Sequence, residues 1–442
     1  MLKKYNYSQL SAQDIADLVD RNTDPSSAIQ DTVLHIIDEV RRHGDRALVD
    51  YAHQFDKVKL DKLYLDADDI DELAFTINRE QQRALEIAFQ NIHKFHSYQL
   101  KRERVVETMP GVKCWREPRP IEKVGLYIPG GSAVLPSTLL MLGVPARIAG
   151  CKEIVVCSPP QASGKINGFV AYCLKLLNIK RIYLVGGAQA VAAMAFGTES
   201  IPKVDKIFGP GNQFVTKAKS MLQGMTNVSI DMPAGPSEVL VLADETANPA
   251  YIAADLLAQA EHGVDSQAVL VATSDTLIDA VNKHLDEQLA VLPRKEMAKK
   301  ALENSYAILV SDLTEGMKFS NAYAPEHLII ESDQWKSISN QILNAGSVFL
   351  GHLTPESAGD YASGTNHTLP TSGYARSYSG VSVDSFVKKI TFQHISEEGL
   401  LQIGSTVEIL AELEGLHAHK NAVSIRKGCT NGELIGLMSS YK

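Results

Sequence analysis

Hydrophobic residues recur at helical spacing over the first hundred residues of the chain. The apolar positions of a first stretch stand at i, i+4, i+7 and i+11 and share one helical face: Ile29, Val33, Ile36 and Val40. The Asp-Pro-Ser sequence at 24–26 is typical of a helix start, and Gly44 is typical of a helix end. A second stretch keeps its apolar residues on one face in the same way: Leu85, Phe89, Ile92 and Phe95. These patterns predict a helix-rich beginning.

From about residue 105 the pattern changes to short apolar runs that end in turns. The runs that predict buried β-strands lie at 124–128, 153–157, 181–185, 238–242 and 268–271. Helical stretches at 171–177 and 251–260 separate two pairs of these strands, which gives two βαβ units. Parallel strands need crossover helices and bury both faces of their sheet, so a doubly wound architecture is favoured over a sandwich.

We therefore predict an α/β fold with two Rossmann-like domains, each an incomplete, doubly wound parallel sheet, and small helical segments at both ends. The 442 residues leave room for two to four compact units of about 150 residues. The expected division is a helical arm at 1–23, a first α/β domain from 24–124 and 236–375, a second Rossmann-like domain at 125–235, and a C-terminal helical segment at 376–442.

Composition places the chain among ordinary folded proteins and excludes some functions. Hydrophobic residues make up 45% and charged residues 21%, far from the composition of a disordered chain. The 43 Lys and Arg against 52 Asp and Glu give a formal net charge of −9, which disfavours nucleic acid as a partner. The most apolar region, 124–150, is interrupted by prolines and glycines, so we expect no membrane-spanning segment.

The first residues and the cysteines indicate the compartment. The chain turns polar at once and lacks the apolar core of a secretory signal, so a cytoplasmic location is expected. The five cysteines are odd in number and have no CxxC spacing, which argues against a disulfide framework and against a thiolate zinc site.

Two pairs of polar residues stand where they can carry chemistry. Gln259 and His262 are three apart near a predicted helix end, a spacing that suits two ligands of one metal but also an ordinary helix terminus. Glu326 and His327 place two acid–base groups at the start of an apolar run. Neighbours in a strand point to opposite faces, so this pair converges only if the chain bends at Pro325. A capping glutamate and a surface histidine are the alternative.

Two further polar segments lie toward the C-terminus. The stretch 355–367 is expected to be a long polar loop with glycine hinges, and Asp360 and His367 are its chemically interesting members. The alternative is a turn aspartate and a solvated histidine. The second segment offers one carboxylate and two imidazoles: Glu414, His417 and His419. Residue spacing alone does not choose between the two histidines.

The chain lacks the two usual nucleotide fingerprints, GxGxxG and GxxxxGK[ST]. The segment 185–190 nevertheless combines a strand end, two glycines and a helix start, which supplies free backbone amides for a pyrophosphate. The Phe-Gly-Pro-Gly-Asn sequence at 208–212 is placed to close over such a ligand. Plain turn chemistry is the alternative for both segments.

Taken together, eight ordered motifs resemble the histidinol dehydrogenase family nearly from end to end. They are GLYIPGGSA at 125–133, VGGAQA at 185–190, KIFGPGN at 206–212, DMPAGPSEVL at 231–240, AQAEHG at 258–263, APEHLII at 324–330, SAGDYASGTNHTLPT at 357–371 and AHKNAV at 418–423. An ordered set of eight is far more specific than any one motif.

The resemblance implies a zinc-dependent enzyme of histidine biosynthesis. It would oxidise L-histidinol to L-histidine through L-histidinal in two steps, reducing one NAD at each step, as the last step of that pathway. The segment 125–235 would carry the NAD site, and each subunit would hold one Zn²⁺ ion. The family is an intertwined homodimer, so the segment 376–442 is expected to complete the site of the neighbouring subunit.

Motif by motif, the resemblance implies roles for individual residues. The expected zinc ligands are Gln259, His262, Asp360 and His419. His327 is the expected general base, and Glu326 is expected to activate the water that adds to the aldehyde. Substrate contacts are expected from Ser237, Gln259, His262, His327, Asp360, His367, Glu414 and His419. The expected residues of the NAD site are Tyr127, Gln189 and Asn212.

Several alternatives remain open at this point. A thiohemiacetal route would use Cys151 or Cys157, although both stand in or beside an apolar strand run without a basic neighbour in sequence, which favours structural roles. His417 competes with His419 as a metal ligand. The alternative functions are a dehydrogenase of a related amino alcohol, a zinc hydrolase, and a metal-regulated sensor without turnover.

Overall fold

The computed structural model describes residues 2–21, 27–130, 135–233 and 235–430. The chain forms two compact units, the first from Met1–Gln99 with Ile121–Phe386 and the second from Leu100–Pro120 with Val387–Lys442. The predicted helix start at 24–26 lies outside the described residues, as do 131–134 and 234, which belong to two of the sequence motifs.

The first sheet of the larger unit has six parallel strands. In spatial order they are β1 (Lys3–Asn6), β12 (Tyr306–Leu309), β11 (Gln267–Ala272), β10 (Glu238–Ala243), β13 (His327–Glu331) and β14 (Ser347–Leu350). Its helices are α1 (Ala12–Val19), α10 (Pro249–Ala260), α11 (Asp275–Leu289), α12 (Lys295–Glu303), α13 (Leu313–Tyr323), α14 (Trp335–Ile338) and α15 (Glu356–Tyr361). The predicted α/β class with parallel sheets is confirmed.

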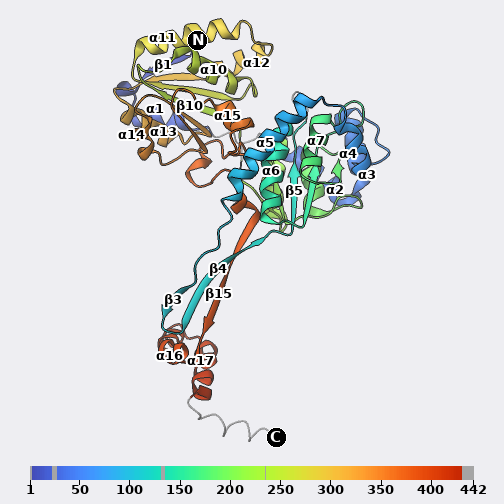
Figure 1. The fold of residues 1–442 in the computed structure, drawn as a ribbon, viewed down its shortest axis with the longest axis vertical. Coiled ribbons are helices and arrows are strands. Elements are labelled where there is room, and N and C mark those ends of the chain that lie inside the picture. The colour runs from blue at the N-terminus through green and yellow to red at the C-terminus, as the bar shows by residue number, and fades with distance from the viewer. Residues whose placement is uncertain (1, 22–26, 131–134, 234, 431–442) are drawn as a thin grey trace. The chain divides into compact units, whose positions relative to one another are not determined.

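Alternate residues of β10 enter two apolar cores on opposite faces of this sheet. Val239 and Val241 pack with residues of α10, α11 and α12, whereas Leu240 and Leu242 pack with residues of α13 and α1. All four side chains are fully buried. Figure 1 shows these two groups of helices on the two sides of the sheet. Because both faces of the sheet are covered, the sequence of β10 after Glu238 is an unbroken run of apolar residues and does not alternate between apolar and polar residues.

The second sheet also has six strands. In spatial order they are β2 (Tyr64–Leu65), β7 (Ile182–Tyr183), β6 (Glu153–Cys157), β5 (Lys123–Tyr127), β8 (Lys206–Phe208) and β9 (Ser229–Ile230). β2 runs antiparallel to β7, and the other neighbours are parallel. The helices packed around it are α2 (Ser27–His43), α3 (Asp45–Tyr51), α4 (Ala67–Ala74), α5 (Arg79–Ser97), α6 (Pro136–Ala149), α7 (Gly168–Leu176), α8 (Gly187–Phe196) and α9 (Gln213–Met225).

The early helices differ from the sequence-based division in one respect. The sequence grouped 24–124 with 236–375, but in the structure α2 packs against α8 and α9, α4 against α7, and α5 against α6. The residues after α1 therefore cover the second sheet rather than the first. The buried face of α5 also differs, since Phe95 is half exposed and the neighbouring His96 is fully buried. The His96 ring lies within hydrogen-bonding distance of the Ile92 carbonyl at 2.9 Å, which explains how a polar residue occupies that face.

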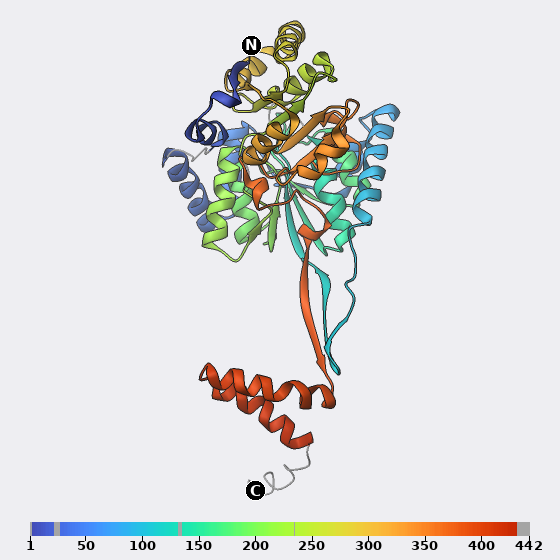
Figure 2. The ribbon, with the colours of Figure 1, turned by 90° about the vertical axis from the view of Figure 1, so that its left-hand side faces the viewer.

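The smaller unit consists of an antiparallel sheet and two helices. Its sheet has the order β15 (Val387–Ile395), β4 (Val112–Pro120) and β3 (Val106–Met109), and its helices are α16 (Glu397–Leu413) and α17 (His417–Thr430). The two helices lie side by side (Figure 2), joined by an ion pair of 2.6 Å between Lys427 and Glu408. Residues 376–386, which the sequence assigned to the tail, belong to the larger unit.

None of the helices in the described part of the chain has the length and apolar content needed to cross a membrane.

Candidate active site

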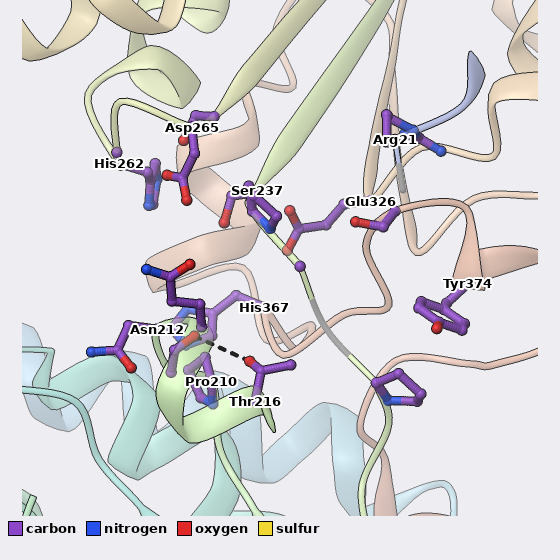
Figure 3. A pocket seen from close by; sticks show the side chains of 18 of the residues that line it. Arg21, Pro210, Asn212, Thr216, Ser237, His262, Asp265, Glu326, His367 and Tyr374 are labelled. Atoms are coloured by element: carbon purple, nitrogen blue, oxygen red, sulfur yellow. Dashed lines mark hydrogen bonds between the residues drawn. The ribbon is translucent and has the colours of Figure 1, made fainter. Parts of the chain in front are cut away.

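A cleft of about 1220 Å³ in the larger unit gathers most of the predicted site residues. Those that line it are Asn212, Ser237, His262, Glu326, His327, Asp360 and His367. Figure 3 shows Ser237, His262 and Glu326 on one side of the cleft and Asn212 on the opposite side. Residues that are far apart in sequence are therefore brought to one cavity.

A second cavity, of about 660 Å³, adjoins the cleft. Tyr127, Gln189 and Asn212 all line it, and Pro129 and Asn212 line both cavities. Tyr127 ends β5, Gln189 lies in the first turn of α8, and Asn212 follows β8. This is the carboxyl edge of the second sheet, where open α/β sheets usually bind nucleotides. The acid–base residues Glu326 and His327 come instead from the amino end of β13 in the first sheet.

Two residues of the second cavity, Asn212 and Tyr127, accept hydrogen bonds from backbone N–H groups at the starts of helices. The Asn212 side-chain oxygen accepts hydrogen bonds from the backbone N–H groups of Phe214 and Val215 and so caps α9. The Tyr127 hydroxyl accepts the N–H of Gly187 at 3.2 Å, at the start of α8. Gly187 has a φ of +63°, a conformation that favours glycine. The two glycines of the 185–190 motif thus let a helix begin directly at the cavity.

Glu326 and His327 converge although they are neighbours in sequence. Strand β13 begins only at His327, and the chain before it bends at Ala324, whose φ is +54°. The Glu326 carboxylate consequently lies 3.7 Å from Nδ1 of His327. The His327 ring is also oriented by the backbone, because Nδ1 lies 3.2 Å from the Glu238 carbonyl oxygen. Both side chains are buried.

The segment expected to be a long loop contains the short helix α15 instead. Glu356 and Asp360 are four residues apart on it and therefore share a face. Asp360 Oδ1 lies 3.5 Å from Nε2 of His327, and Glu356 Oε1 lies 3.6 Å from its Nδ1. Sequence reasoning overlooked Glu356. Its four-residue spacing from Asp360 was the available signal, but this signal requires that the segment be recognised as a helix.

Three potential ligand atoms from His262, Glu356 and Asp360 lie within 4.8 Å of one another. Gln259, at the end of α10, is fully buried, and neither its amide oxygen nor its amide nitrogen has a hydrogen-bond partner among the described residues. Buried polar groups are nearly always satisfied, so the orphaned amide of Gln259, three residues before His262 in the sequence, points to a missing partner. Nitrogen and oxygen donors of this kind fit a divalent cation such as zinc.

Charge and burial shift the ionisation of the acid–base groups. Burial raises the pKa of Glu326 to about 8, against the opposing effect of His327. Burial likewise raises the pKa of Glu356 to about 8. Burial alone would lower the pKa of His327, but Glu356, Glu326 and Asp360 outweigh it and raise the pKa well above its ordinary value. The imidazole thus sits among three carboxyl groups in the cleft.

His367 is fixed by contacts on both ring nitrogens. Nδ1 lies 2.9 Å from the Asp360 carbonyl oxygen, and Nε2 lies 3.1 Å from the Thr138 hydroxyl. Burial lowers its pKa, so the neutral ring donates from Nδ1 and accepts at Nε2. Both nitrogens have partners within the chain, so a substrate contact by His367 stays a prediction.

Glu414 and His419 belong to the smaller unit. Glu414 follows α16, His419 lies in the first turn of α17, and both are exposed, as is His417. Their expected contributions to the metal and substrate sites stay predictions.

Cys151 and Cys157 are buried free thiols. Burial raises the pKa of Cys151 to about 12 and raises the pKa of Cys157 further above its ordinary value. Neutral, buried thiols are poor nucleophiles, which supports structural roles for both.

An ion pair behind Glu326 was also missed by sequence reasoning. Arg21, which follows α1, lies 2.6 Å from the carboxylate of Glu238, the first residue of β10. Both side chains are buried. Glu238 stands in a quoted motif, but its partner comes from the N-terminal arm, and no local pattern joins the two.

Fold and site together define a Rossmann-like α/β oxidoreductase that acts on an alcohol or an aldehyde. Parallel sheets with a nucleotide-type edge adjoin a cleft that holds an acid–base pair and a set of metal donors.

Comparison with known proteins specifies the family. The profile of the family described as histidinol dehydrogenase matches residues 19–427. The histidinol dehydrogenase of Bacteroides thetaiotaomicron is 54% identical over 426 residues, covering 96% of this chain and 99% of the relative. The chloroplastic histidinol dehydrogenase of Arabidopsis thaliana is 53% identical, covering 96% of this chain and 91% of the relative. The crystal structure of histidinol dehydrogenase from Elizabethkingia anophelis superposes with a TM-score of 0.94 at 49% identity, covering 97% of this chain and 99% of that chain.

The chain therefore belongs to the histidinol dehydrogenase family, and the family resemblance of its sequence motifs is confirmed.

Proposed function

We propose that the chain oxidises L-histidinol through L-histidinal to L-histidine and reduces one NAD at each step. The observation that carries the proposal is the convergence of Glu326, His327 and Asp360 in a cleft that adjoins a nucleotide-type cavity. This arrangement supports proton removal and hydride departure at neighbouring points. The family membership supports histidinol as the substrate and NAD as the electron acceptor.

His327 is the proposed general base for the alcohol. In the neutral ring the Glu238 carbonyl oxygen accepts a hydrogen bond from Nδ1–H, which leaves the lone pair on Nε2. The surrounding carboxyl groups raise the pKa of His327, so a cation bound at the proposed metal site would be needed to oppose them and keep the ring neutral. Nε2 is buried, and the carboxylate oxygen Oδ1 of Asp360 lies 3.5 Å from it, longer than a well-formed hydrogen bond. Nε2 is thus oriented to take the hydroxyl proton of an alcohol while the carbon-bound hydride leaves for NAD.

Glu326 is the proposed activator of water in the second step. Addition of water to the aldehyde gives a gem-diol, whose remaining hydride leaves from the same carbon, so one cofactor cavity serves both oxidations. The raised pKa of Glu326, about 8, makes its carboxylate a stronger base than an exposed glutamate. The backbone N–H of Glu238 donates to Glu326 Oε2 at 2.9 Å and fixes that carboxylate toward the cleft.

The proposed zinc ligands are Gln259, His262, Asp360 and His419 of a neighbouring subunit. The first three fit the metal because the orphaned Gln259 amide and the clustered His262 and Asp360 offer one amide, one imidazole and one carboxylate. A bound zinc ion would orient the amine and imidazole of the substrate and add positive charge beside His327. We propose a homodimer, as the family resemblance implies, in which His419 of the smaller unit completes the site of the neighbouring subunit.

Tyr127, Gln189 and Asn212 are the proposed NAD contacts. All three line the second cavity, and Asn212 and Pro129 connect it to the cleft. Ser237, His367 and Glu414 are proposed to hold the substrate, together with the metal ligands and His327.

Separate assays of the two half-reactions test the two acid–base roles. His327→Gln should lower the rates on both histidinol and histidinal by at least about 100-fold. Glu326→Gln should slow histidinal oxidation more than histidinol oxidation, measured as NADH formation. Glu331→Gln is the matched control, because Glu331 also pairs with a histidine, His352 at 2.8 Å, but lies at the opposite end of β13. Equal losses on both substrates for Glu326→Gln would contradict the water-activating role.

A further inference from the structure

Arg21 brings a cation from the N-terminal arm to the wall of the cleft (Figure 3). Its guanidinium lies 2.6 Å from Glu238 Oε1 and 3.6 Å from the centre of the Tyr323 ring. It also donates a hydrogen bond to the Tyr323 carbonyl oxygen. The Arg21 and Glu238 side chains are only 8% and 3% exposed, so this ion pair is shielded from solvent. Tyr323 anchors the guanidinium through its ring and its carbonyl.

Glu238 is in turn joined to Glu326 by two reciprocal hydrogen bonds. The Glu238 N–H donates to Glu326 Oε2 at 2.9 Å, and the Glu326 N–H donates to Glu238 Oε1 at 3.2 Å. The oxygen that accepts the Glu326 N–H is the same oxygen that faces Arg21. The Arg21 charge and the position of the Glu326 backbone are therefore linked through a single carboxylate oxygen.

The two carboxyl groups are buried close together, which makes the cation important. Burial raises the pKa of Glu238 to about 7, and Arg21 opposes that rise. Removing one partner of a buried ion pair leaves the other charge uncompensated, at a cost larger than the net value of the pair. Without Arg21, the Glu238 carboxyl would take up a proton or move, and its hydrogen bond to the Glu326 N–H would weaken.

His327 depends on a different atom of the same residue. Its Nδ1 lies 3.2 Å from the Glu238 backbone carbonyl oxygen in strand β10, whereas Arg21 pairs with the side-chain oxygen Oε1 of the same residue. Loss of the Arg21 charge should consequently disturb Glu326 more than it disturbs His327.

We propose that Arg21 is a positioning residue for Glu326: by holding the Glu238 carboxylate in place, it fixes Glu326 for the water-dependent step of the reaction. This inference rests on the proposed function, because it takes Glu326 as the group that activates water. The N-terminal arm thereby becomes part of the active site rather than a peripheral segment.

Substitution of Arg21 in the full-length protein tests the proposal. Arg21→Met keeps the apolar stem and removes the charge, and it should slow histidinal oxidation about tenfold while histidinol oxidation to the aldehyde changes less than about threefold. The KM values for both substrates should stay within about twofold, since Arg21 acts on Glu326 and not on the ligand. Arg21→Lys keeps the charge and should restore histidinal oxidation to within about threefold. Arg79→Met is the control, because Arg79 forms an exposed ion pair with Glu86.

A double-mutant cycle with Glu238→Gln separates this role from a general loss of structure. If the pair acts as one unit, the Arg21→Met/Glu238→Gln variant should be no slower on histidinal than the slower single variant. Should Arg21→Met fail to fold, as judged by its melting temperature, Arg21→Lys and Glu238→Gln still give the ratio of the two half-reactions. Glu238→Gln alone should then slow histidinal oxidation selectively.

Three results would overturn the proposal. They are equal slowing of both half-reactions by Arg21→Met, no slowing of either, and a raised KM at unchanged kcat. Failure of the proposed function would look different, because Glu326→Gln, assayed in parallel, would then leave the two half-reactions in their original ratio.

Discussion

Gln259 is an energetically costly side chain unless something binds it. An unsatisfied buried polar group costs about 1–3 kcal/mol, and both polar atoms of this amide lack a partner among the described residues. A metal ion bound by His262 and Asp360 would satisfy the amide oxygen if Gln259 is a further ligand, as proposed. The cost of burying Gln259 is therefore consistent with a ligand rather than with a structural role.

The zinc content of the protein tests directly whether Gln259 is a metal ligand. Gln259→Ala should lower the zinc bound per subunit several-fold after dialysis against a weak chelator, because one ligand is lost from a site with few donors. Gln189→Ala is the matched control, since Gln189 is another buried glutamine but lines the second cavity, and it should keep its zinc. Full zinc occupancy in Gln259→Ala would remove this residue from the metal site.

Site residues that stand in local motifs could be identified from the sequence, but their partners from distant segments could not. Gln259, Glu326, His327 and Asp360 were identified because each lies in a recognisable motif. Glu356, Glu238 and Arg21 were missed because their significance depends on contacts between separate segments. The Arg21–Glu238 ion pair joins the N-terminal arm to the amino end of β10, and no spacing rule predicts such a pair.

At the scale of elements, helix α15 carries Glu356 and Asp360 and is capped from α10. The Asp255 carboxylate accepts a hydrogen bond from the Glu356 N–H. α15 is preceded by Pro355, whose side chain provides no cap. The aspartate of one helix thus takes the place of the missing N-cap of another and joins α10, which carries Gln259, to α15, which carries Asp360.

The ionisation of Asp255 gives a testable pH dependence of stability. Burial, followed by the nearby Glu331, raises the pKa of Asp255 from 3.8 to about 7. At a pH between these two pKa values, Asp255 is protonated in the folded chain and ionised in the unfolded chain. Its contribution to the free energy of unfolding therefore falls as the pH rises through this range. Asp255→Asn cannot ionise and still accepts a hydrogen bond.

The free energy of unfolding of Asp255→Asn, relative to that of the unsubstituted protein, should therefore rise by on the order of 2 kcal/mol from pH 5 to pH 8. Denaturant unfolding at each pH measures this difference. A difference in stability that is independent of pH would show that Asp255 titrates normally.

The elements themselves were more predictable than their grouping. The strands of both βαβ units were located because parallel strands buried on both faces read as apolar runs. Helix α15 was not predicted, because its six residues, one of which is Gly359, are too few to show helical periodicity. The early helices were assigned to the wrong sheet, since an apolar helix face does not specify which sheet it covers.

At the scale of the whole molecule, the smaller unit exposes many apolar side chains. On α16, α17 and the connection between them these are Leu401, Ile409, Leu410, Leu413, Leu416 and Ile425. An apolar surface of this kind is typical of a protein–protein interface. It agrees with the proposed homodimer, in which His419 completes the metal site of a neighbouring subunit.

Complementation between two inactive variants tests that arrangement. A dimer of one Gln259→Ala chain and one His419→Asn chain would contain one fully intact site if His419 acts across the subunit interface. Random mixing of the two chains should therefore restore about a quarter of the original activity. His417→Asn in place of His419→Asn should be active by itself. No recovery in the mixed sample would mean that His419 does not act in the partner's site.

The reaction stoichiometry tests the central proposal most directly. A limiting, known amount of histidinol is incubated with excess NAD, NADH is followed by its absorbance, and the amino-acid product is identified by chromatography. We expect two NADH and one histidine for each histidinol consumed. One NADH per histidinol with accumulation of the aldehyde, or no NADH at all, would contradict the proposed two-step oxidation.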